Sequence, residues 1–143
     1  MNESIPMLAP TIALVLWTFV IWTFMYATRI PAIVSSKMVL DPNAPRGEQM
    51  ATLPAAVRWK ADNYNHLMEQ PTLFYAVTLT LAILHDHSSV SVALAWAYVV
   101  GRVVHSLVQT LVNKIELRFG LFVISSLVLL ALTIRAAILV CPV

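Results

Sequence analysis

Four long apolar stretches, separated by shorter polar segments, dominate the chain. They cover about residues 7–26, 55–84, 90–112 and 119–140, and the second opens with a polar lead-in. A helix needs about 20 apolar residues to cross a bilayer, and in lipid the backbone groups must bond within their own helix. The pattern predicts an all-α membrane protein, a left-handed antiparallel bundle of four transmembrane helices that forms one domain over residues 1–143.

Composition supports lipid as the solvent. Of the 143 residues, 59% are hydrophobic and 11% are charged, and the mean hydropathy is +0.80. A soluble domain would carry roughly 25% charged residues. The net charge is only +2 and the basic residues are dispersed, so we expect no nucleic-acid partner.

The basic residues predict the orientation in the membrane. The connection after the first stretch, together with the lead-in to the second, holds Arg29, Lys37, Arg46, Arg58 and Lys60. The third and fourth stretches are joined by a segment with Lys114 and Arg118, whereas residues 85–89 and both termini have no Lys or Arg. Positive loops stay in the cytoplasm, so both termini are expected on the other side. Without a recognisable transit or retention signal, a bacterial inner membrane is favoured.

Two further features bear on topology. The first stretch has no basic n-region and no small-residue cleavage site, so we expect it to be retained. The connection from residue 30 to 53 contains three prolines and Gly47, which predicts an irregular or partly interfacial segment.

A first polar cluster lies where the second stretch begins. Arg58, Asp62, Asn65 and Glu69 are separated by 4, 3 and 4 positions, which places them on one stripe of a helix with His66 beside it. For Arg58 and Asp62 the simpler explanation is a solvated interfacial helix start. Glu69 precedes a long apolar run, which favours function or pairing between helices.

A second polar cluster lies inside the third stretch. Arg102, His105 and Gln109 are spaced 3 and 4 positions apart, and Asn113 continues the row. Such residues usually face a bundle interior and indicate a functional surface. Pairing of Arg102 with Glu69 or Asp62 across the bundle is the structural alternative.

Other candidates carry less chemistry. The single Cys141 has no adjoining base, and His85 and His87 offer too few ligands for a metal, so we expect no metal site. We expect Arg135 to snorkel to the interface or to pair with another helix.

The two clusters together resemble one family. Arg58…Asn65-His-Leu-Met-Glu69-Gln-Pro-Thr-Leu-Phe, then Arg102-Val-Val-His105-Ser-Leu-Val-Gln109, with Arg118 nine residues further on, resemble the second helix, third helix and fourth-helix start of MAPEG proteins (membrane-associated proteins in eicosanoid and glutathione metabolism). The order and spacing of these motifs cover essentially the whole chain.

The resemblance implies a homotrimer that binds glutathione, as co-substrate, between neighbouring subunits near the cytoplasmic side. Arg118 would be the catalytic residue that stabilises the thiolate. The residues that would bind the peptide are Arg29, Arg58, Asn65, His66, Glu69, Arg102, His105 and Gln109, with Glu69 suited to its α-ammonium group.

The implied chemistry is physically reasonable. A free thiol has a pKa near 8.5 and only its thiolate is a good nucleophile, so a nearby guanidinium in a poorly hydrated site would favour ionisation. The thiolate would attack a hydrophobic electrophile or reduce a lipid hydroperoxide, with membrane lipid and an apolar small molecule as the other partners.

Departures from the family pattern keep other functions open. Asn65 and His66 stand where Arg then Asn is common, and Gln109 stands where Tyr is typical. The sequence thus predicts a glutathione transferase or peroxidase, with a non-catalytic lipid-binding or scaffold protein as the alternative. A small transporter or proton-conducting bundle is a third hypothesis, disfavoured by the lack of repeats and broken helices.

Overall fold

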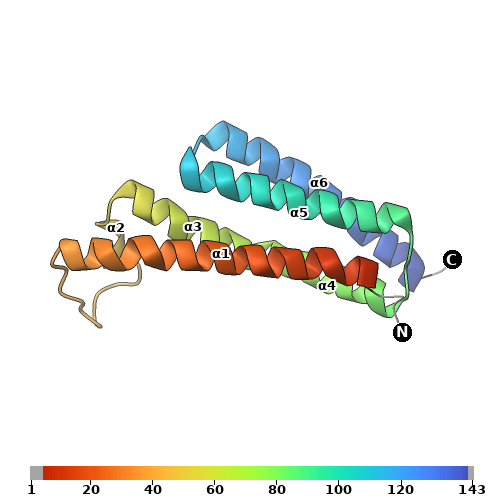
Figure 1. The fold of residues 1–143 in the computed structure, drawn as a ribbon, viewed down its shortest axis with the longest axis horizontal. Helices are drawn as coiled ribbons and strands as arrows, with labels where there is room; N and C mark the ends of the chain where they lie inside the picture. Colours follow the sequence, from red (N-terminus) through yellow and green to blue (C-terminus); the bar gives the residue numbers. More distant parts are fainter. Residues whose placement is uncertain (1–4, 142–143) are drawn as a thin grey trace.

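A computed structural model describes residues 5–141 as a set of helices (Figure 1). They are α1 (Ile5–Ser35), α2 (Glu48–Ala51), α3 (Ala55–Glu69), α4 (Pro71–Ile83), α5 (Ser89–Leu111) and α6 (Ile115–Val140). Three of these helices, α1, α5 and α6, are long and apolar enough to cross a membrane. The predicted all-α class is confirmed, and the apolar helices indicate an integral membrane protein.

The first helix is longer than its apolar stretch. α1 continues past Tyr26 to Ser35, although Pro31 lies within it. Proline removes one backbone N–H, but its fixed φ is compatible with a helix, so the chain can stay helical for the last turn. The expectation of irregular backbone from residue 30 is therefore wrong over residues 30–35, and α2 adds a short helix further along.

The second apolar stretch is divided into two helices at Gln70. Gln70 itself has helical angles, φ −60° and ψ −37°. Pro71 follows and has no N–H, so the carbonyl of Leu67 loses the partner that it would have in an unbroken helix. The N–H of Leu73 bonds the carbonyl of Gln70, three residues back, at 3.0 Å, in place of the carbonyl of Glu69 four residues back. The chain thus keeps its direction, with a break in the hydrogen-bond ladder between α3 and α4.

The helices pack in two layers. α1 runs alongside α3 and α4, while α5 packs most extensively against α6 and also contacts α1 and α3 (Figure 1). Gly101 allows the close approach of α5 and α6, because a Cβ there would lie 2.7 Å from Oγ of Ser125. Small residues serve this purpose in membrane helices, where close packing replaces the hydrophobic effect as the driving force.

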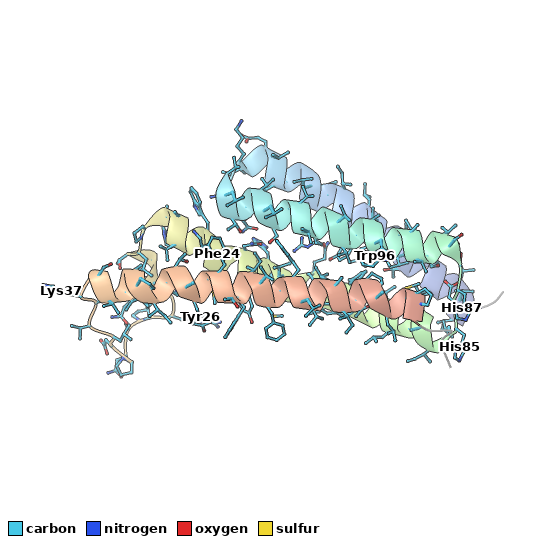
Figure 2. All side chains as sticks on the ribbon, in the orientation of Figure 1. Phe24, Tyr26, Lys37, His85, His87 and Trp96 are labelled. Carbon is cyan, nitrogen blue, oxygen red and sulfur yellow. The ribbon has the colours of Figure 1, made fainter. Side chains whose placement is uncertain are left out.

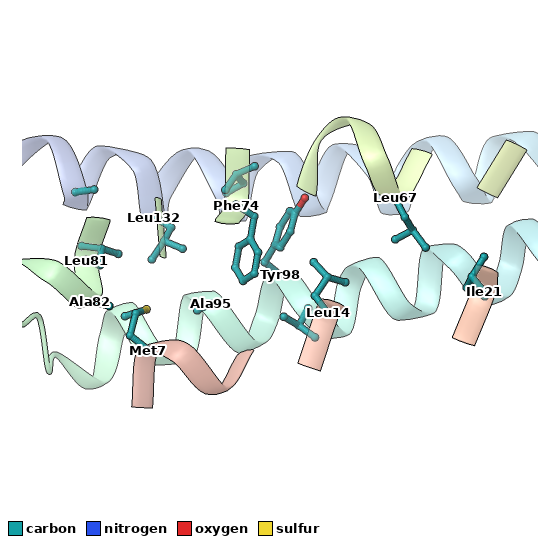
Figure 3. Packing of buried hydrophobic residues seen from close by; sticks show 13 residues of the cluster. Met7, Leu14, Ile21, Leu67, Phe74, Leu81, Ala82, Ala95, Tyr98 and Leu132 are labelled. Carbon is teal, nitrogen blue, oxygen red and sulfur yellow. The ribbon is translucent and has the colours of Figure 1, made fainter. Parts of the chain in front are cut away.

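A core of large side chains joins the two layers. Phe74 of α4 and Tyr98 of α5 are both fully buried and stack with ring centroids 4.6 Å apart (Figure 3). Leu14 of α1 and Leu132 of α6 are also fully buried in the same cluster. Thr11 of α1 adds a hydrogen bond of 2.8 Å to Thr78 of α4.

The two ends of the molecule differ in charge. The connection between α1 and α3 and the turn between α5 and α6, which hold, together with the adjoining helix ends, seven of the nine Lys and Arg residues, lie at one end (Figure 1). The turn between α4 and α5, which carries His85 and His87, lies at the other (Figure 2). There Arg135 donates to Oγ of Ser91 at 2.8 Å, and Ser91 donates to Asp86. Of the two alternatives expected for Arg135, pairing with another helix is the one observed.

Candidate functional site

The polar stripe on α3 faces away from the rest of the chain. Arg58, Asp62, Asn65 and Glu69 all have exposed side chains. The buried face of the same helix carries Leu67 and other residues offset from that stripe. The spacing therefore identified residues that share one face of α3, and in the structure this face is exposed.

A hollow of about 600 Å³ lies beside this stripe at the basic end of the molecule. It will be called the polar hollow, and its lining residues are Met25, Tyr26, Arg29, Gly47, Met50, Ala51, Arg58, Trp59, Ala61, Asp62, Tyr64, Asn65 and Asn113. Three predicted site residues meet here: Arg29 near the end of α1, and Arg58 and Asn65 on α3. Nε of Arg29 is buried and has no hydrogen-bond partner within the chain, so this guanidinium keeps a donor available.

Arg118 reaches the polar hollow through one neighbour. Its Nη1 donates to Oδ1 of Asn113, which lines the hollow. Asn113 has φ +53°, a left-handed conformation that asparagine tolerates and that turns the chain from α5 into α6. The Nε of Arg118 is buried without a partner within the chain. Arg118, the predicted catalytic residue, therefore lies behind the residues that line the hollow, and its Nε–H has no acceptor within the chain.

His66 and Glu69 form a separate pair on the next turn of α3. Nδ1 of His66 lies 3.2 Å from Oε2 of Glu69, and within residues 5–141 no other basic side chain lies this close to a carboxylate. The Glu69 side chain is 66% exposed. Neither residue lines the polar hollow.

The predicted residues on α5 are inside the protein. Arg102, His105 and Gln109 are 1%, 4% and 0% exposed. Arg102 donates from Nη2 to the carbonyl of His66 at 2.8 Å. Within the described chain it makes no ion pair with Glu69 or Asp62, so the alternative of pairing across the bundle is not observed.

Several polar atoms on this α5 stripe lack partners. They are Nε and Nη1 of Arg102, Nδ1 of His105, and both amide atoms of Gln109. The ring of His105 lies edge-on to His66, with centroids 6.3 Å apart. A buried polar atom without a partner is costly, so these atoms mark a place that water or a ligand group would satisfy.

A further buried polar cluster was not predicted from the sequence. Nδ2 of Asn63 on α3 lies 2.7 Å from Oγ of Ser106 and 2.7 Å from Oγ1 of Thr110, both on α5. Asn63 is 1% exposed. The signal was present, because Ser106 and Thr110 are four positions apart in an apolar stretch and therefore share a face.

Two residues of the polar hollow were also missed as site residues. Asp62 and Asn113 both line it, although the sequence placed them only in the two polar rows. Within the described residues, no group of three or more His, Cys, Asp or Glu side chains is arranged to hold a metal ion. The site therefore offers guanidinium, carboxylate and amide groups to a ligand.

The arrangement agrees with a comparison to known families. The profile of the MAPEG family matches residues 7–138, from the first turn of α1 to the last turn of α6. No curated protein and no solved structure matches the chain. Because the family profile covers nearly all of the sequence, the chain belongs to the MAPEG family.

Proposed function

We propose that the protein is a glutathione-dependent membrane transferase or peroxidase whose polar hollow binds the tripeptide. The observation that carries this proposal is the meeting of Arg29, Arg58, Asp62 and Asn65 on one hollow. Glutathione has two carboxylates and one α-ammonium group. Two guanidiniums and one carboxylate complement these charges, and about 600 Å³ lies within the usual range for ligand pockets.

The same geometry indicates which carboxylate would bind the α-ammonium group of glutathione. Asp62 lines the hollow, whereas Glu69 does not. Within a single subunit Asp62 is therefore the better partner for the α-ammonium group. Glu69 remains a candidate only where a neighbouring subunit brings a ligand to it.

Arg118 is the proposed thiolate-stabilising residue. Its guanidinium is held by Asn113 at the hollow and has an unpartnered buried Nε. A cation with a free donor favours the thiolate over the thiol. The thiolate then forms a sulfur–carbon bond to an electrophile, the leaving group departs with its electron pair, and the thiol proton passes to water.

Arg102, His105 and Gln109 take a supporting role in this proposal. Arg102 bonds the backbone of His66, and none of the three lines the polar hollow. They would hold α3 in place against α5 and so position the hollow, instead of contacting the peptide.

The membrane arrangement and assembly are part of the proposal. Together α3 and α4 would form a fourth crossing beside α1, α5 and α6, because Gln70 keeps helical angles between them. A homotrimer would cover the polar face of α3, since Glu69 exposed to lipid would be unfavourable. The basic end would face the cytoplasm, with both termini opposite, in a bacterial inner membrane.

Thermal unfolding of the purified protein tests the ligand. With glutathione at 100 times its dissociation constant, the native state should gain roughly 2.7 kcal/mol. The serine analogue of glutathione should also stabilise, but less, because it has no thiol for Arg118. Arg58→Gln should abolish most of the shift, whereas Arg46→Gln, outside the hollow, should not. Absence of any shift at millimolar glutathione would refute the proposal.

Catalysis has its own test. Arg118→Ala should abolish conjugation of glutathione to a model electrophile while the assembled protein keeps its size in detergent. Full activity in this variant would remove the role proposed for Arg118.

A non-catalytic lipid-binding member is the second candidate, since the MAPEG family includes non-catalytic members as well as glutathione transferases and peroxidases. The burial of Arg102, His105 and Gln109 favours it, because three residues expected on the peptide are inside the helix packing. Thiol-dependent turnover would exclude it, and retained lipid without thiol affinity would support it.

A further inference from the structure

Asn113 connects the polar hollow to Arg118. Of the described residues that line the hollow, Asn113 alone comes from the α5–α6 side of the molecule, and the others belong to α1, to α2 with the glycine before it, and to α3. Arg118 is not one of these lining residues, but it donates a hydrogen bond to Asn113. A hydrogen-bonded path from Arg118 to a ligand in the hollow therefore runs through Asn113.

The backbone fixes the position of Asn113 at the end of α5. Its N–H donates to the carbonyl of Val108 at 2.7 Å, and its φ of +53° turns the chain toward α6. Asparagine, aspartate and glycine adopt this left-handed conformation more readily than most residues. Substitution of Asn113 by aspartate or glycine can therefore change the side chain and keep the turn.

The chemistry of Arg118 determines how the amide of Asn113 is oriented. A guanidinium has only N–H donors, so it must face the amide oxygen, and Nη1 of Arg118 donates to Oδ1 of Asn113. The NH2 group of the amide, on its other branch, is then left as a donor at the hollow. Because Oδ1 accepts a hydrogen bond from a cation, the amide is polarised and its N–H becomes a stronger donor.

The charges around the hollow leave one cation for the sulfur of glutathione. The ionisable residues that line the hollow, together with Arg118 behind them, are Tyr26, Arg29, Arg58, Asp62, Tyr64 and Arg118. Lys114 and Glu116, the charged neighbours of Asn113 in sequence, are exposed and outside the lining. In the proposed complex, two of the three guanidiniums pair with the carboxylates of the peptide, and the one carboxylate pairs with its ammonium group. Arg118 is the cation that remains, and it favours an anionic sulfur.

We propose that Nδ2 of Asn113 donates a hydrogen bond to the thiolate of bound glutathione, and that Arg118 acts on the sulfur through this amide. The inference rests on the proposed glutathione function and deepens it. The thiol proton passes to water, the sulfur keeps its electron pair, and the amide keeps its own hydrogens. Asn113 thus contacts the reacting atom, and Arg118 positions and polarises Asn113.

Ionisation of bound glutathione tests the contact, because a thiolate absorbs ultraviolet light at wavelengths where the thiol does not. In the native protein the pKa of the bound thiol should lie below its ordinary value near 8.5. Asn113→Asp keeps the acceptor for Arg118 and replaces the N–H donor with a negative oxygen. We expect this variant to raise the thiol pKa by at least about one unit, which lowers the thiolate fraction about tenfold at neutral pH. Asn43→Asp adds the same charge at an exposed position outside the hollow and should leave the pKa unchanged.

S-methylglutathione separates a contact with the sulfur from a general effect on the hollow. This analogue keeps both carboxylates and the ammonium group and has no thiol proton to lose. Asn113→Gly, which removes the amide and keeps the turn, should raise the pKa of bound glutathione but change the affinity for S-methylglutathione less than about twofold. Loss of both in parallel would assign Asn113 a structural role and overturn the proposal. If Asn113→Gly folds poorly, the same comparison is made with Asn113→Asp.

A double-mutant cycle tests the route through the amide. If Arg118 acts through Asn113, the combined Asn113→Gly and Arg118→Ala variant should shift the thiol pKa by less than the sum of the single variants. Additive shifts, or an unchanged pKa in both Asn113 variants, would show that Arg118 contacts the sulfur directly and would overturn this inference alone. Absence of glutathione binding to the native protein would contradict the proposed function and this inference together.

Discussion

The polar stripes of α3 and α5 look alike in sequence and differ in the structure. Both place charged and amide residues three or four positions apart, on α3 in the polar lead-in to an apolar run and on α5 within a largely apolar helix. On α3, Arg58 and Asp62 are exposed and line the polar hollow, whereas on α5, Arg102 and Gln109 are almost fully buried. One stripe is available to a ligand, and the other holds helices together or binds water inside.

The comparison shows what helical spacing can establish. Spacing determines which residues share a face, because the helix repeats every 3.6 residues. It does not determine whether that face meets ligand, neighbour or core. The two stripes can therefore be distinguished only by measurements that separate stability from binding.

The largest expected difference is between two arginines. Arg102→Ala should destabilise the protein by about 3 kcal/mol, because it leaves a cavity and removes a donor from the carbonyl of His66. Arg58→Ala should change stability by less than about 0.5 kcal/mol, since its side chain is exposed. Denaturation in detergent measures both, and equal losses would contradict the division between the two stripes.

Two asparagines on α3 provide a closer comparison. Asn63→Ala should destabilise by about 2 kcal/mol, because Ser106 and Thr110 lose their shared partner between α3 and α5. Asn65→Ala, two positions away and exposed, should leave stability nearly unchanged but weaken glutathione binding. The same two assays, unfolding and ligand-induced stabilisation, should rank the variants in opposite order. Similar ranks in the two assays would contradict a structural role for Asn63 and a glutathione-binding role for Asn65.

Two carboxylates on the exposed stripe of α3 test which part of it binds glutathione. Asp62→Asn should weaken glutathione about tenfold, because it removes the charge proposed to meet the α-ammonium group. Glu69→Gln, outside the hollow, should weaken it less than about twofold. N-acetylated glutathione has no ammonium charge, so it should bind the native protein and Asp62→Asn equally well in calorimetry. A larger effect at Glu69 would move the ammonium site to a subunit interface.

The smallest effect is expected at Gln109. Both of its side-chain polar atoms are buried without partners in the chain. Replacing them with an apolar group of similar size should change stability by less than about 1 kcal/mol, with a gain favoured. Melting of Gln109→Leu checks this expectation. A loss above about 2 kcal/mol would show that the amide binds water or a ligand group inside the bundle.

Much of the fold could be predicted from local rules. The apolar stretches gave α1, α5 and α6 because a bilayer demands long apolar helices. The end of α1 was misplaced because Pro31 was taken as a signal for irregular backbone, while helical neighbours kept the turn around it intact. The division at Gln70 follows from Pro71, which was not interpreted as a break, so the expectation of a chain without broken helices is wrong at this point.

The candidate site was predictable only in part. Arg29, Arg58 and Asn65 were grouped as candidates, and they line one hollow. Asp62 was taken for a solvated helix start, and nothing in the sequence singled out Tyr64, which also lines the polar hollow. Their roles depend on how α1 lies against α3, and helix crossing is a tertiary property that no single helix encodes.

The proline break has an electrostatic consequence for Arg102. It leaves the carbonyl of Leu67, in the last turn of α3, without its helix partner, and carbonyls in such a turn carry partial negative charge. Arg102 meets that turn at the carbonyl of His66. Part of the counter-charge of this buried cation therefore comes from peptide groups, and that part would remain after substitution of a neighbouring acid such as Glu69.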